Sequence, residues 1–255
     1  MPLLPHQGCV ELTLLHLQLI AQQRSSHKNT ATGHFAKKEY HEAISEYNEA
    51  IAVCPDYLDY ELAVLRSNIA ACYLKLKEWK EAVSAATTAL DLLDKLEAKE
   101  KEKEKEDEMV EDEIVSEGAL AAGPALDTRK KLQDDIAKIR QKTLFRRAAA
   151  RASLGGWANC EGAIEDYKRL EAMDADLGLL GPAEKKMVQA QLRILPGLAK
   201  ADQEKETAEA LSKLKDLGNM LLKPLGISTD NFKMVKDEKT GGYSMSFEGG
   251  NKGTN

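Results

Sequence analysis

The chain has 255 residues, of which 43% are hydrophobic, 31% are charged and only 5% are aromatic, and its net charge is −6. This length allows one or two domains with a sizeable core. Many charged and few aromatic residues are typical of long amphipathic helices and argue against a β-sandwich or a β-barrel. We therefore predict an all-α fold.

An apolar segment, CVELTLLHLQLI, lies near the N-terminus. No basic region precedes it, and it is too short and too polar to be a secretory signal or a membrane span. We expect residues 1–26 to be a leader that is either a separate amphipathic helix or poorly ordered. No membrane partner is expected.

The four cysteines are far apart and form no C-x-x-C pair; they are Cys9, Cys54, Cys72 and Cys160. This distribution favours reduced thiols in a cytoplasmic protein over disulfides or a metal site. No cofactor is expected.

Three segments of the chain share one pattern: YHEAISEYNEAIAVCP from Tyr40, WKEAVSAATTALDLLD from Trp79 and CEGAIEDYKRLEAMDA from Cys160. In each, an alanine precedes a β-branched residue, and small or apolar residues follow four and seven positions after that alanine. This spacing places the side chains on one helical face. A further helix-like segment precedes each pattern, so the sequence predicts three helix–turn–helix units.

These units resemble the tetratricopeptide repeat family, whose usual period is 34 residues. Ala43 and Ala82 are 39 residues apart, and Ala82 and Ala163 are 81 apart. An insert in the chain accounts for most of the second excess, and three extra residues widen the turn at GGWANC. The resemblance implies a superhelix with repeats one and two in residues 27–95 and repeat three in residues 129–176.

The insert, residues 96–128, carries the acidity of the protein. Its part from 97 to 113 holds ten acidic residues and four lysines, and outside this stretch acidic and basic residues are equal in number. Glu–Lys pairs four residues apart can extend a helix, whereas Gly118, Gly123 and Pro124 favour a linker. We predict a solvated insert that begins as helix and continues as disordered linker, and the helical part is a candidate coiled coil.

The C-terminal part is predicted to close the stack. Residues 182–222 form a predicted capping helix that Pro196 should kink or break and Pro224 should end. Four leucines at helical spacing are expected to cover the last apolar face; they are Leu211, Leu214, Leu217 and Leu221. In the tail, residues 223–255, alternating apolar residues around DEKTGG predict a short β-hairpin.

A basic segment, RQKTLFRRAAARASLG, begins the third unit. Lys142 and Arg146 are four residues apart and share one helical face; Arg147 and Arg151 form a second such pair, turned by about 100°. The residues alone allow two interpretations. The cations could pair with neighbours such as Asp134 or Glu165, or they could face an acidic ligand.

The family resemblance favours a ligand. Many chaperone-binding tetratricopeptide repeat proteins grip the last Asp of a Glu-Glu-Val-Asp tail with a two-carboxylate clamp. The matching positions here are the predicted peptide-binding residues Lys28, Thr32, Asn68, Lys142 and Arg146. Thr32 stands where the family has Asn, within the eroded stretch HKNTATGHF. Asn68 has an alternative interpretation as a helix cap.

The resemblance therefore implies a co-chaperone or adaptor that binds the tails of 90-kDa and 70-kDa heat-shock chaperones. The alternative is a scaffold for another acidic peptide, or for a small GTPase or G-protein subunit, which relatives are thought to bind. No Gly-rich phosphate loop or metal-spaced His/Cys cluster suggests an enzyme. Few aromatic residues accompany the basic segment, so nucleic acid is not an expected partner.

Overall fold

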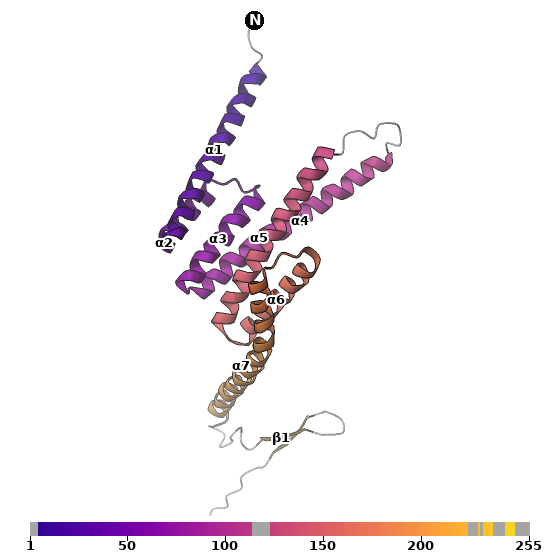
Figure 1. The fold of residues 1–255 in the computed structure, drawn as a ribbon. Helices are drawn as coiled ribbons and strands as arrows, with labels where there is room; N and C mark the ends of the chain where they lie inside the picture. Colours follow the sequence, from indigo (N-terminus) through magenta and orange to yellow (C-terminus); the bar gives the residue numbers. More distant parts are fainter. Residues whose placement is uncertain (1–4, 114–122, 224–228, 230–231, 237–242, 248–255) are drawn as a thin grey trace, which may run out of the picture. The chain divides into compact units, whose positions relative to one another are not determined.

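The computed structural model describes residues 5–113, 123–223, 229, 232–236 and 243–247. They form seven helices and one antiparallel strand pair, and the chain divides into two compact units, Met1–Ala199 and Lys200–Asn255 (Figure 1). The helices are α1 (Pro5–Ala36), α2 (Tyr40–Ala52), α3 (Asp59–Leu76), α4 (Trp79–Glu113), α5 (Gly123–Leu154), α6 (Trp157–Leu177) and α7 (Pro182–Leu222). The strands are β1 (Phe232–Lys236) and β2 (Tyr243–Phe247).

Successive helices of the first unit pack in pairs. Helix α1 packs on α2, α3 on α4 and α5 on α6, and further contacts join α2 to α3, α4 to α5 and α3 to α5. Ala43, Ala82 and Ala163 are all completely buried. An alanine at a helix crossing lets two backbones approach closely, so the shared alanine pattern marks the packed face of the second helix in each pair. The predicted all-α class is confirmed for this unit.

The turns within the first two helix pairs have the same geometry. Lys38 and Lys77 both adopt the left-handed conformation, with φ of 67° and 63°. After each, the next amide donates back to the helix: Glu39 N to His34 O and Glu78 N to Tyr73 O, both at 3.0 Å. This is a Schellman C-cap. In the third pair, Gly155 and Gly156 supply the left-handed residues between the helices.

Residues 5–26 belong to the same helix, α1, as the start of the first predicted repeat. Arg24 on α1 lies 3.7 Å from the Glu61 carboxylate on α3, and His27 lies 2.8 Å from Glu46 on α2.

Among the described residues, no helix has an apolar stretch long enough to cross a bilayer. Cys54, Cys72 and Cys160 are buried and form no disulfide among the described residues, and burial raises the pKa of the Cys72 thiol to about 11.

Both ends of the insert are helical. Helix α4 continues through the acidic stretch to Glu113, and α5 already begins at Gly123. Pro124 lies in the first turn of α5, where its missing N–H breaks no helical bond. The sequence rules overestimated the linker because they weighed the glycine and proline without their position at a helix start. The residues between 113 and 123 lie outside the described part.

The first turns of the insert also contribute to the core. Lys95 and Lys99 on α4 both donate to the carboxylate of Asp59, which is fully buried at the start of α3. Arg129 on α5 donates to the backbone carbonyl of Glu100 at 3.3 Å. Residues 96–128 are therefore not a wholly solvated segment, because the beginning of the insert ties α4 to α3 and to α5.

Only the first half of α7 covers the last helix pair. Val188, Leu195 and Ala199 are buried against the cluster that contains Tyr167. The predicted capping leucines, from Leu211 to Leu221, are all exposed, which corrects the predicted role of that stripe. The helix is also unbroken at Pro196, because burial of its neighbours offsets the one backbone hydrogen bond that proline removes. It ends at Leu222, before Pro224, as predicted.

In the second unit, β1 pairs with β2 in antiparallel register. Phe232 faces Phe247, Met234 faces Met245 and Lys236 faces Tyr243. A six-residue connection joins the strands and lies outside the described residues.

Asp59, which is bound by Lys95 and Lys99, should make the stability of the protein depend on pH. Its burial would raise the pKa of the carboxyl, but the hydrogen bonds from Lys99 and Lys95 outweigh burial and lower the pKa below its ordinary 3.8. A lowered pKa contributes stability that is present above the ordinary value and is lost as pH falls through the folded-state value. We expect the urea midpoint to fall below about pH 4. Asp59→Asn should lower stability at neutral pH by about 1–3 kcal/mol and weaken this acid dependence; an unchanged acid profile would contradict the assignment.

A candidate peptide-binding face

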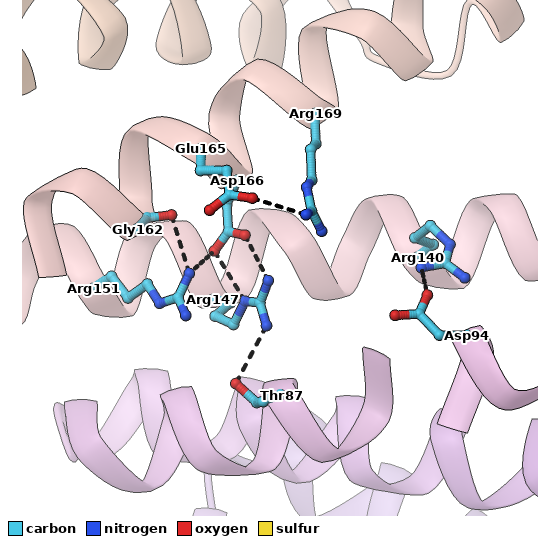
Figure 2. Close-up of polar contacts among 9 residues, drawn as sticks. All are labelled: Thr87, Asp94, Arg140, Arg147, Arg151, Gly162, Glu165, Asp166 and Arg169. Atoms are coloured by element: carbon cyan, nitrogen blue, oxygen red, sulfur yellow. Dashed lines mark hydrogen bonds and ion pairs between the residues drawn. The ribbon is translucent and has the colours of Figure 1, made fainter. Parts of the chain in front are cut away.

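Two arginines of the basic segment on α5 are held by one buried carboxylate. Arg147 donates to both oxygens of Asp166 on α6, from Nε at 3.0 Å and from Nη2 at 2.7 Å (Figure 2). Arg151 donates to the same carboxylate at 2.9 Å and to the Gly162 carbonyl at 3.0 Å. Asp166 is completely buried, so this pair is internal to the third helix pair and does not face a ligand.

The remaining ion pairs of this region also lie within the protein, either between helices or along one helix. Arg140 pairs with Asp94 and Glu97 on α4, so α5 is tied to the helix that carries the insert. Glu165, one of the acids expected to neutralise α5, pairs instead with Arg169 on its own helix (Figure 2). The sequence missed Asp166 because periodicity predicts which face is apolar and not which acid lies beneath it.

Arg146 differs from these arginines, because its partners are neutral. Its Nη1 donates to the backbone carbonyl of Ser67 at 2.6 Å and to the Ser67 hydroxyl at 2.7 Å. Thr143 donates its one proton to the Ile139 carbonyl, so the Ser67 hydroxyl must donate to Thr143, at 2.6 Å, and accept from Arg146. Both Ser67 and Thr143 are buried. The network fixes the Arg146 guanidinium between α3 and α5.

The charge of Arg146 is poorly compensated where it lies. The side chain is half-buried, and burial lowers the pKa of its guanidinium, opposed by nearby Tyr47 and Cys72. No carboxylate among the described residues contacts it, and its Nε and Nη2 donors make no hydrogen bond there. Arginine remains charged at any physiological pH. A half-buried cation with open donors favours an added anion.

Thr32 is bound internally and is not a free donor. Its hydroxyl donates to the Lys28 carbonyl, one turn earlier on α1, at 2.8 Å. Its single proton is then used, so the hydroxyl of Tyr47 on α2 donates to Thr32 across 3.3 Å. Burial raises the pKa of Tyr47, with the Thr32 hydrogen bond acting in the opposite direction, so the phenol stays protonated.

All five predicted residues lie on α1, α3 and α5, and a chain of contacts links the surroundings of three of them. Thr32 contacts Tyr47, Tyr47 lies within the electrostatic reach of Arg146, and Arg146 binds α3 beside Asn68. Lys142, one turn before Arg146, is exposed, and its amino group makes no hydrogen bond or ion pair with the described residues. We name Lys28, Thr32, Asn68, Lys142 and Arg146 the clamp face.

The side chains of two residues of the clamp face, Lys28 and Asn68, have no polar contact with the other described residues. Lys28 is half-buried and Asn68 is half-buried, and neither side chain bonds to another described residue. Asn68 lies in the middle of α3, which begins at Asp59, so the helix-cap interpretation is wrong. The residues that sequence reasoning missed are Ser67, Thr143 and Tyr47, because small hydroxyl side chains at core positions resemble ordinary packing. The described residues contain no cluster of His, Cys, Asp and Glu suited to a metal ion.

Comparison with known proteins gives partial matches. No family model matches the chain. A segment of 89 residues is 33% identical to mitochondrial import receptor subunit TOM70 of Homo sapiens, covering 34% of this chain and 15% of that protein. For TOM70 of Mus musculus the match is 35% over 65 residues, 26% of this chain and 11% of that protein. The chain therefore matches only a small part of the length of these relatives.

Two solved structures are similar over most of the chain. The first TPR domain of the human RPAP3 protein has a TM-score of 0.42 and 19% identity, over 71% of this chain and 96% of that one. The first TPR of Spaghetti (RPAP3), bound to the HSP90 peptide SRMEEVD, has a TM-score of 0.42 and 20% identity, over 69% of this chain and 97% of that one.

The internal arginines should be essential for folding. Replacing Arg147 with Ala leaves Asp166 buried with only Arg151 beside it, so the free energy of unfolding should fall by about 3–5 kcal/mol. Arg169→Ala, which removes an exposed pair on α6, should cost less than about 1 kcal/mol. Chemical denaturation monitored by circular dichroism measures both, and equal losses would contradict the structural role of Asp166.

Proposed function

We propose that the protein is a non-enzymatic adaptor that binds the acidic C-terminal tails of heat-shock chaperones on the clamp face. The ligand is the Glu-Glu-Val-Asp tail of the 90-kDa class, with the 70-kDa class as a second source of a similar tail. The observation that carries the proposal is Arg146, a half-buried guanidinium held by Ser67 with no acidic partner among the described residues.

The chemistry of the clamp face suits a terminal carboxylate. A carboxylate only accepts hydrogen bonds and is costly to desolvate unless fixed donors replace water. Arg146 is fixed by the Ser67–Thr143 network, and Lys142 adds a mobile ammonium one turn away. Charge-assisted bonds are worth about 1.5–3 kcal/mol each, so after the ordering cost of a flexible tail we expect micromolar affinity, about −8 kcal/mol.

The scaffold for this face is proposed to be three tetratricopeptide repeats, formed by α1–α2, α3–α4 and α5–α6. The shared buried alanines and the matching turns at Lys38 and Lys77 support this arrangement. The segment KLKDLGNMLLKPLGISTDNFKMV and the following strand resemble the C-terminus of tetratricopeptide repeat protein 1 and its fungal relatives. In this proposal the protein acts in the cytoplasm.

A signalling partner such as a small GTPase or G-protein subunit remains the alternative for the scaffold. It rests only on the resemblance, since no described contact of the clamp face is specific for a folded domain. A different acidic peptide would bind the same cations without needing a terminal carboxylate.

Peptide titration distinguishes these ligands. A peptide ending in Glu-Glu-Val-Asp should bind with micromolar affinity, weaken with salt and lose affinity when its C-terminus is amidated. Lys142→Ala should weaken binding by about 1.5–3 kcal/mol, roughly tenfold or more, with unchanged stability because Lys142 has no partner in the described part of the chain. Lys168→Ala on α6, also exposed, is the matched control. Equal affinity for the amidated peptide would replace the clamp by a general acidic-peptide site.

A second prediction uses the one position that departs from the family pattern. The Thr32 proton is donated to Lys28, so Thr32 offers a ligand no donor, whereas an Asn amide has two N–H groups on a longer arm. Thr32→Asn should therefore tighten binding of the free-acid peptide by about 0.5–1.5 kcal/mol, measured by calorimetry. The gain should vanish with the amidated peptide. No gain with the free acid in a folded variant would show that Thr32 does not face the tail.

A further inference from the structure

The second half of α7 exposes several large apolar side chains to solvent. Leu211, Leu214, Leu217 and Leu221 are 61%, 66%, 60% and 77% exposed. Contiguous exposed apolar surface of this kind marks an interaction site. All four residues belong to the second unit, which begins at Lys200.

The exposed residues follow the spacing of a coiled coil. Positions that alternate four and three residues apart form a continuous line along α7, which we name the α7 seam: Gln203, Thr207, Ala210, Leu214, Leu217 and Leu221. Every residue of the seam is exposed. Its first half carries small or polar side chains and its second half carries leucines.

This asymmetry in size selects an antiparallel partner with the same sequence. In an antiparallel pair of two such helices, Leu214 of one chain lies opposite Ala210 of the other, Leu217 opposite Thr207 and Leu221 opposite Gln203. Each large side chain then meets a small or flexible one, which fills the space between the helices evenly. A parallel pair would instead place leucine against leucine at one end and leave Gln203 and Thr207 against themselves at the other.

The charged residues of this part of α7 also favour an antiparallel pair. Residues 200–209 contain four acids and two lysines, whereas residues 210–223 contain three lysines and one acid. An antiparallel pair sets the acidic half beside the basic half, and a parallel pair sets like charges together. In the antiparallel register, the flanking positions bring Glu206 of one chain near Lys213 of the other, where opposite charges set the orientation of a coiled coil. Leu211 of each chain lies near its counterpart at the twofold axis.

One described residue after α7, Thr229, contacts the flank of the seam. Thr229 donates from its amide and its hydroxyl to the side-chain oxygen of Asn219, both at 2.7 Å. A Cβ on Gly218 would approach the Thr229 methyl within 2.7 Å, so this contact needs glycine. Gly218 is on the flank of the seam, one residue after Leu217, and the seam leucines stay exposed.

We propose that the second half of α7 is a self-association surface, on which a second copy of the chain binds through the same seam in antiparallel orientation. The interface is isologous, as a twofold dimer requires. It is independent of the clamp face and of the identity of the peptide.

Sedimentation velocity of the full chain over a concentration series tests this dimer. A helix pair of this length should give a reversible dimer in the micromolar range. Leu217→Asp should raise the dimer dissociation constant by about 100-fold, because it buries a charge at the centre of the interface. Leu177→Asp, on α6 and 54% exposed, is the matched control and should leave the dimer intact. Circular dichroism should show that both variants keep their helix content.

Charge reversal tests the orientation. Glu206→Lys alone and Lys213→Glu alone should each weaken the dimer several-fold, and the double variant should restore it, because the two positions meet only across an antiparallel interface. A chain that stays monomeric at all concentrations would overturn the proposal. A dimer that tolerates Leu217→Asp would also overturn it, and a dimer that the double variant fails to restore would overturn the antiparallel register.

Discussion

A hydrogen-bonded network around Ser67 joins the third helix pair to the second, and the candidate site depends on it. Arg146 and Thr143 on α5 both bind Ser67 on α3, 79 and 76 residues away along the chain, across the acidic insert. A helical stack buries its faces only against neighbouring units, so a long insertion threatens the register between them. The short polar contacts of Ser67 fix that register and orient the guanidinium in the same step. Stability and a possible binding geometry thus share one set of atoms.

The basic segment of α5 divides its charges between two tasks. Arg140, Arg147 and Arg151 pair with acids on the helices to either side, and these pairs hold α5 in the stack. Arg146 is held by neutral oxygens and Lys142 by nothing described, so positive charge remains on one face of the same helix. Alternate faces of a single helix can do this because residues 146 and 147 point about 100° apart. The net acidity of the protein is located elsewhere, in the insert.

Sequence reasoning predicted the helix pairs because alanines at Ala43, Ala82 and Ala163 impose a packing requirement that periodicity reveals directly. It located α5 and the i,i+4 pair of Lys142 and Arg146 for the same reason. It could not find Asp166, Ser67 or Tyr47, whose roles depend on which helix lies opposite. It also left open a helix cap as the alternative for Asn68, because nothing local shows that α3 begins at Asp59. The Thr32 hydroxyl was expected to be open to a ligand, yet the backbone of its own helix takes its proton.

Helix α7 shows why a leucine stripe alone does not reveal its partner. Both halves of the helix have apolar residues at helical spacing, and the sequence assigned the second half to the end of the stack. The first half fulfils that role, since Val188 and Leu195 are buried there. Once the last face of the stack is covered, further leucines add no stability to the monomer, and exposing them costs about 25 cal/mol for each Å² of apolar surface left in water. A helix that keeps such residues in a graded order, small at one end and large at the other, with charge reversed between the ends, is complementary to its own inverted copy. The partner is therefore encoded in the asymmetry of the stripe and not in its hydrophobicity.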